Sequence, residues 1–137
     1  MRLNSGFTLI EVMVVVVILG ILAAIVVPKV MDRPDMARVT KAEQDIRALE
    51  SALSLYRLDN FRYPTTDEGL GVLISGRTKN GDRKSSGYLS RVPKDPWGNE
   101  YLYLQPGQHS EIDVYTLGAD GRPGGKGFDT DIGNWDL

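Results

Sequence analysis

The hydrophobic and polar positions first single out the N-terminal part of the chain. From Phe7 to Val27 the residues read FTLIEVMVVVVILGILAAIVV, and Glu11 is the one charged side chain among them. A helix rises about 1.5 Å per residue, so a run of this length matches the roughly 30 Å hydrocarbon core of a bilayer. The pattern therefore predicts a membrane-spanning helix over residues 7–27, preceded by a short leader, residues 1–6.

Two other interpretations of this segment fit the residues less well. A secretory signal peptide ends at a small-x-small cleavage site followed by a polar chain. That fits poorly, because Ala23 and Ala24 lie inside the run and three more apolar residues follow them. A generic single-span anchor fits the length but leaves Glu11 unexplained, since an ionisable group costs roughly 2.5 kcal/mol near the bilayer centre.

A cut between Gly6 and Phe7 would give Glu11 a partner. No Lys, Arg or His lies within the apolar run. Cleavage would create an α-ammonium group four residues before Glu11, and the amine of a neighbouring subunit could then neutralise the carboxylate in low dielectric. The dipole at a helix N-terminus also favours a carboxylate in the first turn. The alternative is an unpaired Glu11 that reaches the lipid headgroups.

Residues 28–60 predict an amphipathic continuation of the helix. Pro28 and Pro34 are expected to interrupt it, because each removes a backbone donor. Beyond them apolar side chains recur at spacings of four and three, and charged side chains occupy the other faces. The apolar stripe consists of Ala42, Ile46, Leu49, Leu53 and Tyr56. We expect it to face a domain core rather than a partner, and the helix to end near Asn60.

Residues 61–137 change to short strands and frequent turns. Residues 100–104 and 112–117 alternate or are β-branched and aromatic, which predicts an antiparallel hairpin. His109 lies in the loop between them and is expected to be an ordinary surface residue. A short helix is predicted over residues 66–75. The fold class is therefore α+β: a long N-terminal helix, transmembrane in its first half, packed on a small antiparallel sheet.

Composition excludes several classes of function. A chain of 137 residues supports one globular domain at most, and its net charge of −2 predicts no nucleic-acid partner. The absence of cysteine excludes disulfides and thiol chemistry. With a single histidine no Ser–His–Asp set can be assembled, and GGKG at residues 124–127 departs from a phosphate-binding loop. We expect no enzymatic activity.

The glycine-rich segment after Leu117 carries three carboxylates. Asp120, Asp129 and Asp131 would repel one another there unless a hard cation lay between them. Calcium suits oxygen ligands, and a softer metal is disfavoured without cysteine or a spare histidine. The spacing is not that of an EF-hand. From the residues alone, a calcium site and a solvated acidic loop both remain open.

The string Gly6-Phe7-Thr8-Leu9-Ile10-Glu11 resembles the cleavage and methylation motif of type IV pilins and pseudopilins. In that family a prepilin peptidase cuts after the glycine and methylates the new N-terminal phenylalanine. The resemblance implies that Gly6 and Phe7 are processing residues and that Glu11 takes part in assembly. It also implies that residues 7–27 are both a membrane anchor and the packing core of a helical fibre.

Three further motifs resemble the major pseudopilins of type II secretion systems, the general secretion pathway protein G family. They are DPWGN at 95–99, YTLGADG at 115–121 and DIGNW at 131–135. With the N-terminal motif, the resemblance covers nearly the whole chain. It implies a calcium ion held by Asp120, Asp131 and backbone carbonyls that include Leu117. The spacing before the last aspartate varies in the family, so the assignment of Asp129 as a ligand comes from the residue pattern and not from the resemblance. The ion would close the loop as a disulfide does in many type IV pilins.

The function implied by the resemblance is that of a structural subunit of the type II secretion pseudopilus, a short periplasmic fibre that drives folded proteins through an outer-membrane channel. The implied partners are further copies of the chain, minor pseudopilins, the inner-membrane assembly platform, the prepilin peptidase, and membrane lipid before assembly. The implied location is the bacterial inner membrane, crossed once, with the C-terminal domain in the periplasm. Two alternatives are a type IV major pilin for adhesion or motility and a passively anchored calcium-binding periplasmic module. The lack of cysteine and the acidic loop argue against the first.

Overall fold

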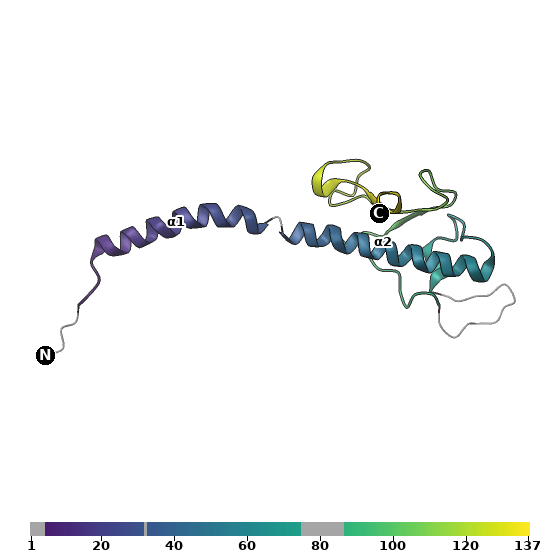
Figure 1. The fold of residues 1–137 in the computed structure, drawn as a ribbon, viewed down its shortest axis with the longest axis horizontal. Helices are drawn as coiled ribbons and strands as arrows, with labels where there is room; N and C mark the ends of the chain where they lie inside the picture. Colours follow the sequence, from purple (N-terminus) through teal and green to yellow (C-terminus); the bar gives the residue numbers. More distant parts are fainter. Residues whose placement is uncertain (1–4, 32, 75–86) are drawn as a thin grey trace. The chain divides into compact units, whose positions relative to one another are not determined.

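The computed structural model describes residues 5–31, 33–74 and 87–137, so the first four residues of the predicted leader lie outside the described part. The chain divides into two compact units, Met1–Asp35 and Met36–Leu137 (Figure 1). The first holds the apolar helix, and the second holds a helix and all of the sheet.

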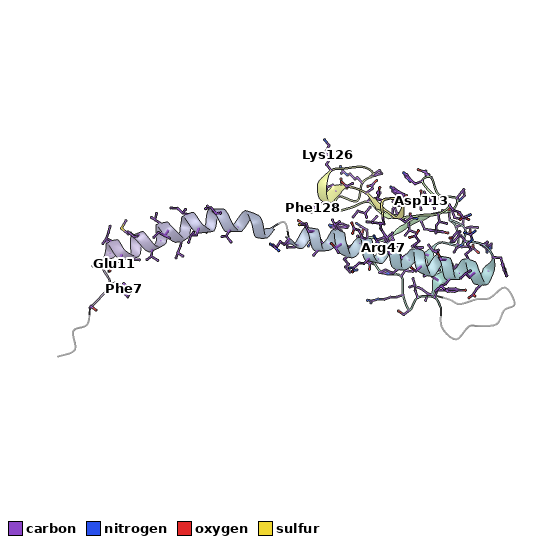
Figure 2. All side chains as sticks on the ribbon, in the orientation of Figure 1. Phe7, Glu11, Arg47, Asp113, Lys126 and Phe128 are labelled. Carbon is purple, nitrogen blue, oxygen red and sulfur yellow. The ribbon has the colours of Figure 1, made fainter. Side chains whose placement is uncertain are left out.

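Helix α1 spans Leu9–Met31. Its stretch Leu9–Val27 is long and apolar enough to cross a membrane, and none of it is covered by the rest of the chain. In Figure 2 its side chains stand out around the helix with nothing packed over them. The prediction that Pro28 interrupts this helix is wrong, because α1 runs past it to Met31. A proline removes one backbone donor, and the neighbouring turns keep the helix regular.

Helix α2 spans Arg33–Asn60 and buries one face. Pro34 does not break it either, because it lies in the first turn, where a missing backbone donor costs nothing. The buried side chains are Ala42, Ile46, Leu49, Ala52, Leu53 and Tyr56. They include the whole predicted stripe, which confirms that it faces the domain core. The helix ends at Asn60, and Phe61 follows with a φ of 58°.

The sheet has three antiparallel strands in the order β1-β2-β3. Strands β1 (Leu102–Leu104) and β2 (Asp113–Thr116) form the predicted hairpin, with Leu102 opposite Tyr115. Strand β3 (Ile132–Gly133) pairs with the other edge of β2 and was not predicted. Instead of the short helix expected over residues 66–75, one 3-10 turn, η1, covers Leu70–Leu73.

The stripe of α2 and the inner face of the sheet form one core. Side chains from η1 and the hairpin join the stripe there; they are Leu70, Leu73, Tyr101, Tyr103, Ile112 and Val114. The buried tyrosine hydroxyls keep partners: Tyr101 donates to Asp45 Oδ2 at 2.9 Å and Tyr103 to the Pro64 carbonyl at 2.8 Å. The predicted α+β arrangement of a helix packed on a small antiparallel sheet is therefore confirmed.

Candidate functional site

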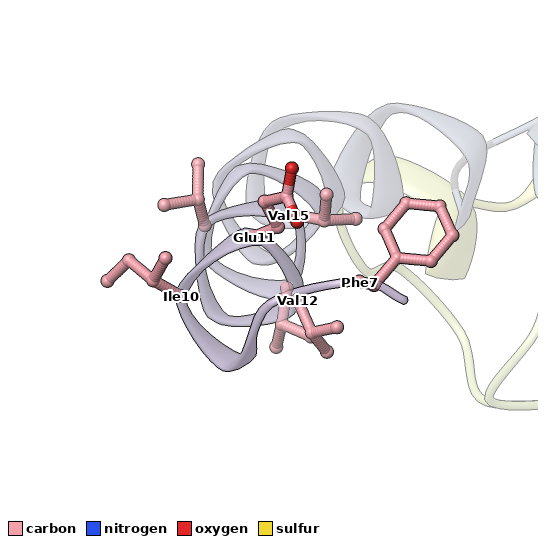
Figure 3. Close-up of a pocket in the computed structure, with 7 residues that line it drawn as sticks. Phe7, Ile10, Glu11, Val12 and Val15 are labelled. Atoms are coloured by element: carbon pink, nitrogen blue, oxygen red, sulfur yellow. The ribbon is translucent and has the colours of Figure 1, made fainter. Parts of the chain in front are cut away.

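The first candidate site is the start of α1, where Thr8 and Glu11 close a capping box. Glu11 Oε2 accepts hydrogen bonds from the Thr8 backbone N–H at 2.8 Å and from Thr8 Oγ1 at 2.9 Å. The Glu11 N–H donates in return to Thr8 Oγ1 at 3.3 Å. Such reciprocal bonds satisfy donors that a helix N-terminus leaves free. Figure 3 shows Glu11 and Val15 on one side of this turn, among apolar side chains.

Thr8 is a helix-capping residue that was not among the predicted site residues. The signal was present, since a threonine followed three residues later by a glutamate is the sequence pattern of a capping box. The capping box gives Glu11 a role within a single copy of the chain, besides the pairing with a neighbour's amine that the sequence suggests. Gly6 and Phe7 precede the helix and are exposed, and a Cβ added at Gly6 would meet nothing within 4 Å.

The second candidate site is the C-terminal loop between β2 and β3. The chain turns at Gly118, whose φ is 71°, and the Ala119 N–H donates to the Phe128 carbonyl at 3.0 Å. A Cβ at Gly118 would lie 2.8 Å from the Thr130 carbonyl oxygen, and one at Gly125 would lie 2.3 Å from the Asp129 carbonyl oxygen. The loop can fold this tightly because these two glycines let backbone carbonyls pack directly against them.

Asp131 is the central side chain of this loop. Its Oδ2 accepts a hydrogen bond from the Gly124 N–H at 2.9 Å, which ties the two sides of the loop together. Its Oδ1 is buried and has no hydrogen-bond partner. A buried carboxylate oxygen without a donor is costly, and a cation is one way to compensate for it.

The other predicted ligands are placed differently. The Asp120 side chain is exposed, and its Oδ1 accepts a hydrogen bond from the Arg122 N–H at 3.0 Å. Asp129 is also exposed, and Leu117 is half-buried just after β2. Within residues 5–31, 33–74 and 87–137, no three acidic or histidine side chains gather closely enough to hold a metal. The structure thus presents the unpartnered oxygen of Asp131 and a loop rich in carbonyls rather than a cluster of three carboxylates.

A buried aspartate, Asp95, joins the turn at residues 95–99 to strand β2. It is 5% exposed. Its Oδ1 accepts the N–H groups of Trp97 at 3.0 Å and Asn99 at 2.7 Å, and its Oδ2 accepts the Thr116 hydroxyl. A Cβ at Gly121 would lie 3.8 Å from the Asn99 side-chain nitrogen. The segments at 95–99 and 115–121 that carry the resemblance are therefore packed against each other.

A second buried aspartate, Asp113, organises the loop before β2. Its carboxylate is 1% exposed and accepts N–H groups from Gln108 at 2.7 Å, His109 at 3.1 Å and Ser110 at 3.1 Å. Burial raises the pKa of Asp113, but these hydrogen bonds outweigh burial and hold the pKa below its ordinary value.

His109 is exposed, as predicted for a surface residue, and its side chain also makes two defined contacts. Its Nδ1 lies 3.1 Å from Asp113 Oδ2, and its ring stacks on Trp135 with 3.9 Å between the ring centroids. Neither contact can be anticipated from the sequence, because one crosses the loop and the other joins that loop to the C-terminal segment.

These features define a class. An uncovered apolar helix with an acidic first turn is followed by an amphipathic helix on a small sheet, which is the architecture of pilin-like subunits. The chain matches the prokaryotic N-terminal methylation motif over residues 1–27 and the family described as type II secretion system (T2SS), protein G, over residues 29–135. It belongs to that family.

Similar proteins agree over the full length of the chain. The type II secretion system core protein G of Pseudomonas aeruginosa is 59% identical over 98% of this chain and 97% of its own. That of Vibrio cholerae is 56% identical over 100% of this chain and 95% of its own. The crystal structure of the major pseudopilin from the type 2 secretion system of enterohaemorrhagic Escherichia coli covers 77% of this chain and 89% of its own, at 45% identity and a TM-score of 0.65.

These relatives support a subunit of the type II secretion pseudopilus and do not favour the alternative of a type IV major pilin. The family is one of structural subunits.

Proposed function

We propose that the chain is cut between Gly6 and Phe7, that Phe7 is N-methylated, and that mature copies polymerise through α1 into a fibre that drives folded proteins across the outer membrane. The observation that carries this proposal is the apolar helix Leu9–Val27, which is uncovered along its length and lies within the match to the N-terminal methylation motif over residues 1–27. A helix that is hydrophobic all round needs lipid or other helices around it. Lipid would surround α1 before assembly, and α1 helices of other copies would do so in the fibre.

The proposal places the chain in the bacterial inner membrane, with residues 36–137 in the periplasm. Its partners would be the prepilin peptidase, the inner-membrane assembly platform and the minor pseudopilins. A passive anchor differs from this proposal in one measurable respect, because a passive anchor keeps Met1.

The test is the mass of the chain extracted from cells with a working secretion system. We expect a mature protein that begins at methylated Phe7. Gly6→Val should block cleavage, and the block would reflect the peptidase, because a Cβ at residue 6 meets nothing in the protein. Gly20→Ala is the matched control, since its Cβ also lies in open space but far from the cut. An intact chain from Met1 to Leu137 in secreting cells would refute the proposal.

Glu11 can serve assembly by its charge or by capping α1, and two variants separate these roles. Glu11→Gln keeps an oxygen for the Thr8 N–H and removes the charge. Thr8→Ala removes the hydroxyl that Glu11 shares and keeps the charge. If a neighbour's ammonium pairs with Glu11, Glu11→Gln should enter the membrane and fail to form fibres, whereas Thr8→Ala should polymerise. Normal fibres from Glu11→Gln, seen by electron microscopy, would exclude the charge pairing.

We also propose that the C-terminal loop binds calcium. The donors would be Asp131, whose Oδ1 has no partner, together with Asp120 and backbone carbonyls that include Leu117. Asp129 is a further candidate because its backbone packs against Gly125. These oxygen donors suit calcium, which accepts irregular geometry, better than magnesium, which requires near-octahedral geometry. Bound calcium would neutralise the Asp131 charge and hold the loop closed.

Thermal melting of the full chain in detergent tests the calcium site. Calcium at a hundredfold excess over Kd should add about 2.7 kcal/mol to the free energy of unfolding. For a unit of this size the melting midpoint should rise by roughly 10 °C. Asp131→Asn should remove most of that rise, because it keeps an oxygen for the Gly124 N–H and loses the charge. Asp136→Ala, an exposed neighbour, is the control. A chelated wild type whose midpoint does not respond to millimolar calcium would support the solvated-loop alternative.

A further inference from the structure

The register of β3 on β2 determines which residue lies opposite Leu117, the residue that follows β2. Tyr115 pairs with Gly133 and Thr116 with Ile132. The same antiparallel register, extended by one pair, sets Asp131 opposite Leu117. This extended register would bring two predicted metal ligands together beside a strand of only two residues. A slip of one residue would move Asp131 by about 3.3 Å and turn its side chain to the other face of the sheet.

The ladder itself cannot hold that register firmly, because it contains two residue pairs. Asn134, the next residue after β3, adds two side-chain hydrogen bonds to this short ladder. Its Oδ1 accepts the Val114 N–H at 2.9 Å, and its Nδ2 donates to the Ile112 carbonyl at 3.0 Å. Residues two apart on a strand present their backbone groups to the same edge. The side-chain amide of Asn134 therefore continues the ladder along β2 where the β3 backbone leaves it.

Other contacts place this amide accurately. Asn134 Nδ2 also lies 3.4 Å from Glu50 Oε1 on α2 and 3.4 Å from Ser110 Oγ. Directly after it, Trp135 folds back over Gly133, where a Cβ would lie 2.3 Å from the ring, and reaches His109. The C-terminal segment is thus fixed both to the sheet and to the helix at one residue.

We infer that Asn134 is a positioning residue for the C-terminal loop: its side-chain amide fixes the register of β3 on β2 and so sets Asp131 opposite Leu117. The consequence for metal binding rests on the calcium site proposed above. The register role does not, because every contact that carries it lies within the chain.

Two measurements on the full chain in detergent test this inference. Asn134→Ala should accelerate amide hydrogen exchange at least tenfold at Thr116 and in β3, two pairs along the ladder from the lost bonds. It should also weaken calcium binding, followed through the melting midpoint, by 10- to 100-fold, as loss of a ligand-orienting group typically does.

The matched control is Asn60→Ala. Asn60 is also half-buried, and its Nδ2 donates to the Tyr56 carbonyl at 2.9 Å at the end of α2. Its loss should lower the melting midpoint without changing the Kd for calcium or the exchange of β3. If Asn134 only stabilises the fold, Asn134→Ala should likewise lower the melting midpoint without changing the Kd for calcium or the exchange of β3.

The outcomes separate the two claims. Unchanged exchange at Thr116 and in β3 would overturn the register role. Faster exchange with an unchanged Kd would overturn the role in positioning the metal loop. A wild type that does not respond to calcium would overturn the calcium site and that positioning role together, and the exchange rates would still decide the register role.

Discussion

Replacing the buried Asp113 by asparagine should destabilise the globular unit by about 3 kcal/mol at pH 7. The substitution keeps the shape of the side chain but exchanges one carboxylate oxygen for an NH2 group. In the wild type, Oδ2 accepts hydrogen bonds from the N–H groups of Gln108 and His109. With an NH2 group in the place of Oδ2, these two donors would face a third donor and would lose their acceptor. Each charge-assisted bond contributes roughly 1.5 kcal/mol or more, and the carboxylate is 1% exposed, so water cannot replace the lost acceptor.

Urea unfolding and thermal melting of the full chain in detergent measure this loss. At about 4 °C per kcal/mol for a unit of roughly a hundred residues, the melting midpoint should fall by roughly 12 °C. Tryptophan fluorescence is a local probe, because Trp135 stacks on His109 and the ring of His109 contacts Asp113. Asp67→Asn, at an exposed turn, is the control and should change stability by less than about 0.5 kcal/mol.

The pH dependence gives the reasoning a sign that can be checked. Hydrogen bonds hold the pKa of Asp113 below its ordinary value, despite burial, so the ionised form is the one that stabilises the fold. That stability is fully present above the unfolded pKa of about 3.9 and is lost as pH falls through the folded pKa. The difference between wild type and Asp113→Asn should therefore be constant near pH 7 and shrink below about pH 4. A difference in unfolding free energy between wild type and Asp113→Asn of less than about 1 kcal/mol at pH 7 would refute the stabilising role of the ionised Asp113. A difference that does not change with acidification would also refute it.

Three further predictions concern Leu53, Glu68 and Gly133. Leu53→Ala, at a side chain that is 0% exposed, should cost 2–5 kcal/mol in urea unfolding, whereas Leu58→Ala, at 71% exposed, should cost less than about 0.5 kcal/mol. The bidentate Arg62 guanidinium lowers the pKa of Glu68 to about 2, so stability from this pair should be lost as pH falls from about 4.5 towards 2. Glu68→Gln should cost about 1 kcal/mol at pH 7, because solvent screens this partly exposed pair. Gly133→Ala should shift tryptophan emission to the red, because its Cβ would lie 2.3 Å from the adjacent indole ring.

The sequence predicted those elements of the fold whose apolar residues recur at regular spacing. The uncovered apolar helix and the buried face of α2 follow from periodicity, and the hairpin follows from alternation around a turn. The strands β1 and β2 are shorter than predicted, and Glu100, at the start of the first predicted strand, pairs with Lys94 in an isolated bridge instead. The predicted break at Pro28 does not occur, because one missing backbone donor does not end a helix whose neighbouring turns are intact.

The parts that could not be predicted depend on single long-range contacts. Strand β3 has two residues and no alternation, so nothing local distinguishes it from loop. The amide of Asn134 and the stack of His109 on Trp135 join segments twenty or more residues apart. The acidic loop was predicted as a place for a cation, but sequence could not tell that Asp131 alone would turn a buried, unpartnered oxygen inward.

If calcium binds this loop as proposed, that arrangement determines what its removal should do. Two hydrogen bonds link the sides of this loop, one from the Gly124 N–H to Asp131 and one from the Ala119 N–H to the Phe128 carbonyl. None of these residues contributes to the hydrophobic core, which lies between α2 and the sheet. Chelation should therefore leave the core and the far-ultraviolet circular dichroism unchanged, while the loop becomes more accessible to protease. Cleavage should fall between Gly121 and Gly127, in the exposed segment that the two bonds enclose. Cleavage that is equally fast with and without calcium would mean that the chain's own hydrogen bonds already hold the loop closed.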